Sequence, residues 1–197
     1  MLVLLDNGHG VDTSGKRSPD GRLREYKFAR EIVQLIHCEL GKRGINSIIL
    51  VPEDYDVSLT ERCVRANNYY NVDKSVILIS IHCNAAGNGD KWMTGRGWEA
   101  WTSVGQTKSD ELAELLYSTA EAWLPPGTKI RIDKTDGDKD KEKNFTILYK
   151  TKCPAVLTEN LFQDNKEDVE YLLSEEGKKA IVNLHVEGIV NYLSYNG

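Results

Sequence analysis

The 197-residue sequence lacks any apolar run of the ~18 residues that a membrane-spanning helix needs. It also lacks a recognisable signal peptide, because Met1 is followed directly by the apolar segment Leu2–Leu5, without basic residues or a small-residue cleavage site. We therefore expect a chain that has no membrane span and is made in the cytoplasm. No linker or internal repeat divides the sequence, so residues 1–197 are expected to form a single domain.

An excess of positive charge is missing as well. Lysine and arginine number 25 against 30 aspartates and glutamates, which gives a net charge of −5. A nucleic-acid-binding protein needs a basic surface to neutralise phosphates, so this class is not expected. The four cysteines, Cys38, Cys63, Cys83 and Cys153, show no C-x-x-C spacing. The absence of this spacing argues against a zinc ribbon, and four scattered cysteines are too few for a disulfide scaffold. We therefore expect free buried thiols.

Apolar runs typical of strands alternate with segments of helical periodicity along the chain. Such an alternation predicts an α/β fold, in which a twisted, mostly parallel sheet carries helices on both faces. The expected strands are residues 2–6, 47–51, 76–81, 145–149 and 155–158, and the expected helices are residues 25–43, 58–70, 109–123, 165–173 and 175–194.

Two polar segments interrupt this pattern. Residues 86–98 are rich in glycine and lack periodicity, which predicts a surface loop. Residues 131–143 hold five basic and five acidic residues with almost no apolar ones. We interpret this second segment as a solvated loop or mobile flap, in preference to a dedicated binding element.

Three of the apolar runs end in residues suited to metal chemistry. His9 follows the first strand in a Gly-His-Gly turn, His82 ends the strand 76–81, and Glu159 ends the strand 155–158. The carboxyl ends of parallel strands meet at the sheet edge where ligands bind. Two histidines and a carboxylate at that edge predict a catalytic metal site.

A third ligand and a general base complete this prediction. Glu25 begins the helix 25–43 over the same edge, although a carboxylate there is also explained by the helix dipole, which favours it by ~0.3–1 kcal/mol. Two histidines and a glutamate form a donor set of hydrolytic zinc sites, and the missing H-E-x-x-H motif excludes a zincin. Glu159 beside a metal would be placed to act as a general base. The alternative is that its carboxylate caps a neighbouring loop.

Further polar residues lie near the same edge. Asn84 follows His82 and is a candidate for orienting a ligand or the substrate. Glu99, in a tryptophan-rich segment, is a second candidate for substrate binding at the cleft. We expect Arg62 to form a structural ion pair, and His185, in the middle of a helix, to serve packing or lie exposed instead of binding a metal.

Five motifs occur in order along nearly the whole chain, and together they resemble the zinc-dependent N-acetylmuramoyl-L-alanine amidases of the amidase-3 type. That family includes bacterial cell-wall amidases and phage endolysins. Two positions depart from its pattern: Asn7 stands where the family usually has proline, and Leu161 where a glycine often precedes the phenylalanine. The motifs are Leu5–Gly10 (LDNGHG), Gly21–Glu25 (GRLRE), Val57–Arg62 (VSLTER), Ile79–Ala85 (ISIHCNA) and Pro154–Glu159 (PAVLTE).

The resemblance implies that His9, Glu25 and His82 bind one Zn²⁺ ion and that Glu159 is the catalytic glutamate. It also implies a six-stranded twisted sheet surrounded by helices. The expected reaction is hydrolysis of the amide between N-acetylmuramic acid and L-alanine in peptidoglycan. The alternatives are a non-catalytic peptidoglycan-binding domain and a zinc peptidase or deacylase that acts on a different amide.

The resemblance also bears on the setting. We expect a monomer that acts on the cell wall, either as a released lysin or as the trimmed catalytic part of an exported enzyme.

Overall fold

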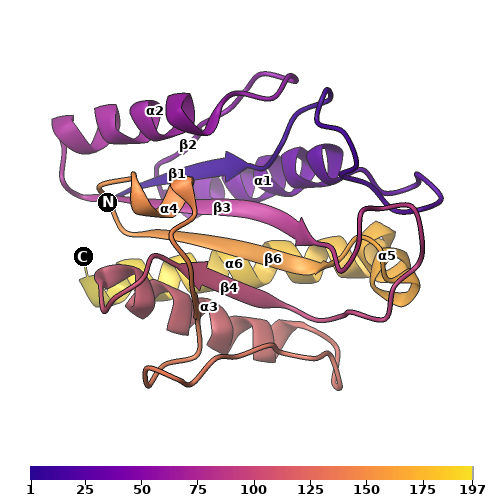
Figure 1. The fold of residues 1–197 in the computed structure, drawn as a ribbon. Helices are drawn as coiled ribbons and strands as arrows, with labels where there is room; N and C mark the ends of the chain where they lie inside the picture. The colour runs from indigo at the N-terminus through magenta and orange to yellow at the C-terminus, as the bar shows by residue number, and fades with distance from the viewer. Residues whose placement is uncertain (197) are drawn as a thin grey trace.

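A twisted sheet of six strands forms the centre of the computed structural model, which describes residues 1–196 (Figure 1). The strands lie in the order β2-β1-β3-β6-β4-β5. β4 runs antiparallel to β6, and every other neighbouring pair is parallel. The predicted mostly parallel α/β sheet is therefore confirmed. The strands are β1 Leu2–Asn7, β2 Ser47–Ile49, β3 Val76–Asn84, β4 Glu99–Thr102, β5 Lys141–Glu142 and β6 Ala155–Phe162.

Helices cover both faces of the sheet, as expected, but they cover them unequally (Figure 1). The helices α1, α3, α5 and α6 pack together on one face, whereas α2 and the short α4 lie on the other. The second face is therefore less fully covered, and it has room for a pocket. The helices are α1 Glu25–Lys42, α2 Leu59–Val72, α3 Lys108–Trp123, α4 Thr146–Tyr149, α5 Lys166–Leu173 and α6 Glu175–Asn196.

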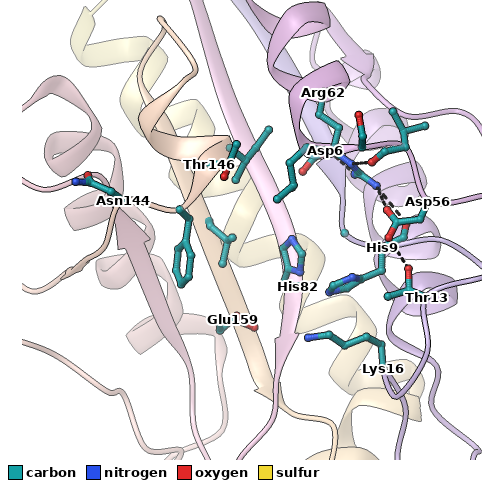
Figure 2. A pocket seen from close by; sticks show the side chains of 17 residues that line it. Asp6, His9, Thr13, Lys16, Asp56, Arg62, His82, Asn144, Thr146 and Glu159 are labelled. Atoms are coloured by element: carbon teal, nitrogen blue, oxygen red, sulfur yellow. Dashed lines mark hydrogen bonds and ion pairs between the residues drawn. The ribbon is translucent and has the colours of Figure 1, made fainter. Parts of the chain in front are cut away.

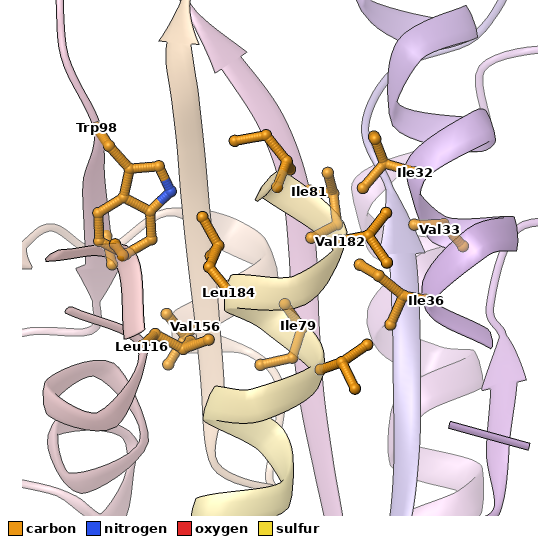
Figure 3. Packing of buried hydrophobic residues seen from close by; sticks show 14 of the residues in the cluster. Ile32, Val33, Ile36, Ile79, Ile81, Trp98, Leu116, Val156, Val182 and Leu184 are labelled. Carbon is orange, nitrogen blue, oxygen red and sulfur yellow. The ribbon is translucent and has the colours of Figure 1, made fainter. Parts of the chain in front are cut away.

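The main core lies between the sheet and the helices α1, α3, α5 and α6. Figure 3 shows Ile79 and Ile81 of β3 pointing toward Ile36 of α1 and Leu184 of α6. Intervening residues such as Leu78 pack in a second cluster on the opposite face. β3 is thus apolar on both faces, which is the pattern of a strand inside a parallel sheet.

The same alternation sends the polar strand ends to the α2 side. Leu78 and Leu157 pack on that face. Because side chains two or four positions apart share a face of a strand, His82 follows Leu78 and Glu159 follows Leu157 onto it. The parallel register sets His82 directly beside Glu159. The fold therefore places a histidine and a carboxylate together on the less fully covered face.

Two local predictions were wrong. The predicted strand 145–149 is instead occupied by the short helix α4 (Thr146–Tyr149), whose Ile147 and Leu148 pack against the α2 side of the sheet. A five-residue apolar run carries too little periodicity to separate a strand from a helical turn. The segment 131–143 is not wholly solvated, because Lys141–Glu142 form β5 and Asp140 is only 1% exposed.

Other sequence-based expectations have clear outcomes. The cysteines are free as predicted, but Cys38 is exposed while Cys63, Cys83 and Cys153 are buried. Within residues 1–196, none of the helices combines the length and the apolar character that crossing a membrane requires.

His185 of α6 lies fully buried beneath the sheet, which gives a prediction for stability. Its Nε2 is 2.9 Å from the hydroxyl of Thr158 and its Nδ1 is 2.7 Å from the carbonyl of Ile181. Burial lowers the pKa of His185 from 6.5 to about 4. The unfolded chain therefore binds more protons between these pH values, and stability falls as the pH drops through this window, by up to roughly 3 kcal/mol.

We expect His185→Gln to remove this part of the acid sensitivity. Urea unfolding of the protein and the variant at pH 7 and at pH 4.5 measures the difference. Lost packing contacts add a decrease in stability that is the same at both pH values, so only the difference between the two pH values reports on His185. An equal dependence on pH in both proteins contradicts the assignment to His185.

Candidate metal centre

Three side chains from separate elements meet at the edge of the sheet. His9 lies in the turn after β1, Glu25 is the first residue of α1, and His82 lies near the end of β3. Oε1 of Glu25 is 3.3 Å from Nε2 of His9 and 3.0 Å from Nδ1 of His82. The possible ligand atoms all lie within 4.8 Å of one another. The structure thus brings together the three predicted ligands.

Close contacts fix the turn that carries His9. Its φ of 62° lies in the left-handed region, which a residue other than glycine rarely adopts. The carbonyl of His9 accepts a hydrogen bond of 3.0 Å from Nη1 of Arg30. A Cβ on Gly8 would lie 2.3 Å from the imidazole of His82, and one on Gly10 would lie 2.0 Å from the backbone nitrogen of Asp56. The turn therefore requires both glycines because the chain packs too tightly for a side chain.

A buried arginine anchors the strand that leads into this turn. The guanidinium of Arg62 on α2 is 2% exposed and donates to Oδ1 of Asp6 and to the carbonyls of Asn7 and Val57, each at 2.7 Å. The second oxygen of Asp6 accepts from the hydroxyl of Ser80 at 2.5 Å. The predicted structural ion pair of Arg62 is confirmed, and it ties α2 to the C-terminal end of β1.

Glu25 is buried, and its carboxylate is held from several sides. Oε1 also accepts from the backbone nitrogen of Cys83 at 3.1 Å, and Oε2 accepts from Nε2 of Gln163 at 3.0 Å. Burial alone raises the pKa of Glu25, but hydrogen bonds from His82 and His9 outweigh burial and hold the pKa well below its usual range. The site therefore keeps a buried negative charge.

The donor set fits a zinc ion. Two imidazole nitrogens and a carboxylate oxygen are ligands that Zn²⁺ accepts, and three protein ligands leave a position open for chemistry. The buried negative charge of Glu25 favours a cation at the same place. Gln163 was missed from the sequence, because no spacing or periodicity marks a residue that follows β6 as a partner of Glu25.

Glu159 on β6 lies next to His82 of the metal-ligand set, as Figure 2 shows. Its Oε2 is buried and has no hydrogen-bond partner. Burial raises the pKa of Glu159 to about 8; His82 lowers it, and the charge of Glu25 adds to the increase. A carboxyl group with this pKa can take up and release a proton near neutral pH.

A pocket of about 640 Å³ opens over these residues (Figure 2). One side is polar and the other is largely apolar, so the pocket suits a ligand with a polar and an apolar part. The polar side includes Thr13, Lys16 and Asp56, and the other side includes Phe145, Ile147 and Leu157. The sequence did not predict that Lys16 and Asp56 line the pocket, because most charged residues in loops have no specific role.

Asn84 at the end of β3 and Glu99 at the start of β4 lie on the two strands that flank β6, which carries Glu159. Nδ2 of Asn84 donates to Oε1 of Glu99 at 2.8 Å, and Glu99 is opposite Glu159 in the β4–β6 register. The other oxygen of Glu99 pairs with Arg131 at 2.5 Å and with Lys141 at 3.3 Å. Neither Asn84 nor Glu99 is among the described residues that line the pocket. Their part in substrate binding stays a prediction.

The buried pair of Arg62 and Asp6 predicts a large effect on stability. Arg62→Met leaves the Asp6 carboxylate without its countercharge, and we expect the free energy of unfolding to fall by about 3–5 kcal/mol. The matched control is Arg65→Met one turn along α2, where the partly exposed arginine pairs with Glu53 and Glu61. That change should cost about 1 kcal/mol or less. Urea denaturation compares the two, and equal losses contradict the anchoring role of Arg62.

Known proteins resemble this chain over nearly its whole length. The family model for N-acetylmuramoyl-L-alanine amidase matches residues 3–191. The endolysin of Bacillus phage SPP1 is 30% identical over 98% of this chain and 66% of its own length. The amidase CwlM of Bacillus licheniformis is 28% identical over 96% of this chain and 67% of its own length.

A solved structure agrees with these relatives. The N-acetylmuramoyl-L-alanine amidase from Clostridium difficile 630 superposes with a TM-score of 0.82 at 26% identity, covering 100% of this chain and 98% of that one. The chain spans about two thirds of the length of the two curated relatives. On the match of the family model, the chain belongs to the amidase-3 family of N-acetylmuramoyl-L-alanine amidases.

Proposed function

We propose that this protein is a zinc-dependent hydrolase that cleaves the amide between N-acetylmuramic acid and L-alanine in peptidoglycan. The observation that carries the proposal is the convergence of His9, Glu25 and His82 beside the unpaired carboxyl of Glu159 in one pocket. The family relationship supplies the substrate class. The place of action is then the cell wall, where a lysin like that of phage SPP1 would work.

His9, Glu25 and His82 would hold one zinc ion. When bound, zinc supplies Lewis-acid chemistry, polarising a carbonyl oxygen and making water more acidic. Gln163 and the backbone nitrogen of Cys83 hold the Glu25 carboxylate by hydrogen bonds. Such supporting contacts fix the orientation of a ligand and are part of its affinity for the metal.

Glu159 would carry the proton transfers. Its carboxylate takes a proton from the water whose oxygen attacks the lactyl carbonyl carbon. A carbon–oxygen bond forms, and the carbon–nitrogen bond to L-alanine breaks as Glu159 returns the proton to the leaving nitrogen. The raised pKa of Glu159 assists the first step, because a carboxylate with a higher pKa is a stronger base, and the protonated group then holds the proton until the nitrogen leaves. A nearby cation favours the carboxylate and so assists the first step.

The pocket walls would position the substrate. Thr13, Lys16 and Asp56 offer polar contacts, while Phe145 and Ile147 offer an apolar surface on the other side. Peptidoglycan joins a sugar to a peptide, so a pocket with these two sides suits the junction that is cleaved. Asn84 and Glu99 would contact the substrate outside this pocket or support the strand beside Glu159.

The first test replaces the proposed base. Glu159→Gln keeps the size of the side chain and removes its basicity, so we expect hydrolysis of dye-labelled peptidoglycan to fall by at least about a hundredfold. Zinc content, measured by elemental analysis, should stay near one ion per chain. The control is Glu170→Gln on the exposed side of α5, which should keep full activity. Substantial activity in Glu159→Gln contradicts its role as the base.

Mass spectrometry of the products identifies the bond that is cut. Peptides with a new N-terminal L-alanine and intact glycan strands support the amidase. Cleavage at any other bond identifies a peptidase or deacylase, and the absence of cleavage by the zinc-loaded protein identifies a binding domain.

The second test removes a ligand. We expect His82→Ala to lose stoichiometric zinc because two donors remain, while His37→Ala on α1, whose histidine contacts Ser47, should keep it. Elemental analysis after dialysis gives the metal content, and circular dichroism shows whether the fold is retained. A folded His82→Ala variant that keeps one tightly bound zinc ion excludes His82 from the ligand set.

A further inference from the structure

A second hollow, of about 330 Å³, adjoins the catalytic pocket on the side of the turn after β1. The two hollows share Thr13 and Lys16, so one opens directly beside the other. Arg17, Arg24 and Tyr26 also line the second hollow. A molecule held at the metal centre can therefore extend past Lys16 into this space.

The second hollow is basic, although the chain as a whole carries a net charge of −5. Lys16, Arg17 and Arg24 line it, and we call it the basic hollow. Within residues 1–196, Arg17 and Arg24 take part in no ion pair, and Lys16 has only a distant one, with its Nζ 4.0 Å from Oε2 of Glu25. The lining includes one carboxylate, that of Asp12, whose Oδ1 accepts a hydrogen bond from a backbone nitrogen at 2.7 Å. The basic hollow therefore holds an excess of positive charge.

The backbone places this positive charge unfavourably. Arg17 and Arg24 pair with each other in an isolated antiparallel bridge. Like charges at opposite positions of such a pair are destabilising. Arg24 is also the N-cap residue of α1, where the helix dipole disfavours a cation. An anion bound in the basic hollow offsets both effects.

The backbone of Lys16 is fixed where the two hollows meet. Its carbonyl accepts a hydrogen bond of 3.0 Å from the backbone nitrogen of Glu25, at the start of α1. The preceding residue, Gly15, packs against the glycine-rich loop, since a Cβ on Gly89 would lie 2.9 Å from its carbonyl oxygen. Figure 2 shows the amine of Lys16 pointing toward His82. The amine is therefore held beside the metal centre.

Lys16 is also the cation that remains for a substrate. Among the described residues that line the catalytic pocket, Lys16 and Arg62 alone carry an amine or a guanidinium group. Arg62 is 2% exposed and is bound by Asp6. The carboxylate of Glu25 would share its charge with the metal, which weakens its hold on Lys16. A negative group of the substrate can then take its place.

We propose that the basic hollow binds the stem peptide of peptidoglycan by its carboxylates, and that Lys16 binds the free α-carboxylate of the residue after L-alanine. This inference rests on the proposed amidase function. The second residue of the stem peptide is a D-glutamate linked through its side chain, so its α-carboxylate is free unless the wall carries an amide there.

The reach of the stem peptide agrees with this assignment. Two residues of extended peptide span roughly 7 Å, so the α-carboxylate lies no farther than this from the nitrogen that leaves. Nζ of Lys16 lies within 4.0 Å of an oxygen of the ligand Glu25, which puts it in range. Arg17 and Arg24 lie farther along the basic hollow, where the rest of the stem peptide would pass. Lys16 is thus a specificity-determining residue, which favours acidic over amidated stem peptides.

Two synthetic N-acetylmuramoyl tripeptides test the inference. They carry D-glutamate or D-isoglutamine at the second position and are otherwise identical. The zinc-loaded protein should cleave the acidic form with a kcat/KM about tenfold higher, mainly through KM, because the contact is made before the reaction begins. Lys16→Met should abolish this preference by raising KM for the acidic form at least fivefold. Lys16→Arg, which keeps the charge, should retain most of it.

The arginines of the basic hollow should have smaller effects. Arg17→Gln and Arg24→Gln should each raise KM for the acidic form about two- to fivefold, because water screens exposed charges. The matched control is Arg43→Gln, which removes the same charge at the other end of α1, where Arg43 pairs with Glu187. This control should keep the KM and the preference of the parent protein.

Binding provides a measurement that does not depend on turnover. Calorimetry with zinc-loaded Glu159→Gln, which should bind the tripeptides without cleaving them, should show a Kd for the acidic form about tenfold lower. Equal Kd values for the two tripeptides overturn the inference, whether or not the parent protein is an amidase. A preference that survives in Glu159→Gln combined with Lys16→Met also overturns it, because another group then binds the carboxylate.

The remaining outcomes separate this inference from the proposed function. Cleavage of both tripeptides at equal rates and with equal KM overturns the preference and leaves the amidase intact. Cleavage of whole peptidoglycan at a different bond shows that the amidase function is wrong, and this inference falls with it. If Arg17→Gln weakens binding to an anionic phosphate polymer of the wall but leaves the tripeptide kinetics unchanged, that polymer occupies the basic hollow and the stem peptide does not.

Discussion

The buried carboxylate of Glu25 is the constraint on which the site depends. An isolated carboxylate in the interior costs several kcal/mol, so the charge persists only where other groups stabilise it. Here the imidazoles of His9 and His82, the amide of Gln163 and a backbone nitrogen surround it. These groups come from the turn after β1, from β3 and from the residues after β6. The carboxylate therefore requires β1 and β3 to be neighbours and α1 to begin at their carboxyl ends.

The unequal covering of the sheet turns this cluster into a site. The face of β3 that carries Ile79 and Ile81 is covered by α1 and α6, whereas the α2 side stays open at His82 and Glu159. On the α2 side, the buried ion pair between Arg62 and Asp6 joins α2 to the end of β1. Beyond that pair the pocket begins. The same packing that buries Glu25 thus leaves Glu159 beside the pocket. The pKa of Glu25 is lowered and the pKa of Glu159 is raised.

The sequence predicts the strand ends of the site because continuous apolar runs identify the inner strands. His9, His82 and Glu159 follow from that pattern, and the sheet order then brings the last two into register. Glu25 follows from the family resemblance, since a carboxylate at a helix start is ordinary by itself. Gln163 could not be predicted, because its role depends on the path of the chain after β6.

The pattern of charged residues was the least reliable predictor of local structure. The segment 131–143 resembles a solvated loop by composition, yet its pairing with β4 buries Asp140. A strand of two residues leaves no periodicity to detect. Residues 145–149 failed for the related reason that a short apolar run fits a strand or a helical turn equally well. Residues 144–147, which overlap the second of these segments, line the pocket. In both segments, long-range packing decides the local structure.

Leu161 adopts a backbone conformation that usually favours glycine. Its φ of 63° lies in the left-handed region, which residues other than glycine rarely adopt. A leucine in this conformation is strained by roughly 1–2 kcal/mol. Its side chain is 3% exposed within the main core, and burying a leucine contributes about 1.5–3 kcal/mol. Packing thus offsets the strain at this point of β6, where the register against β3 shifts. Beyond this irregularity β6 stays paired with β3: the backbone nitrogen of Gln163 donates to the carbonyl of Asn84 at 2.8 Å, and the side chain of Gln163 reaches Glu25.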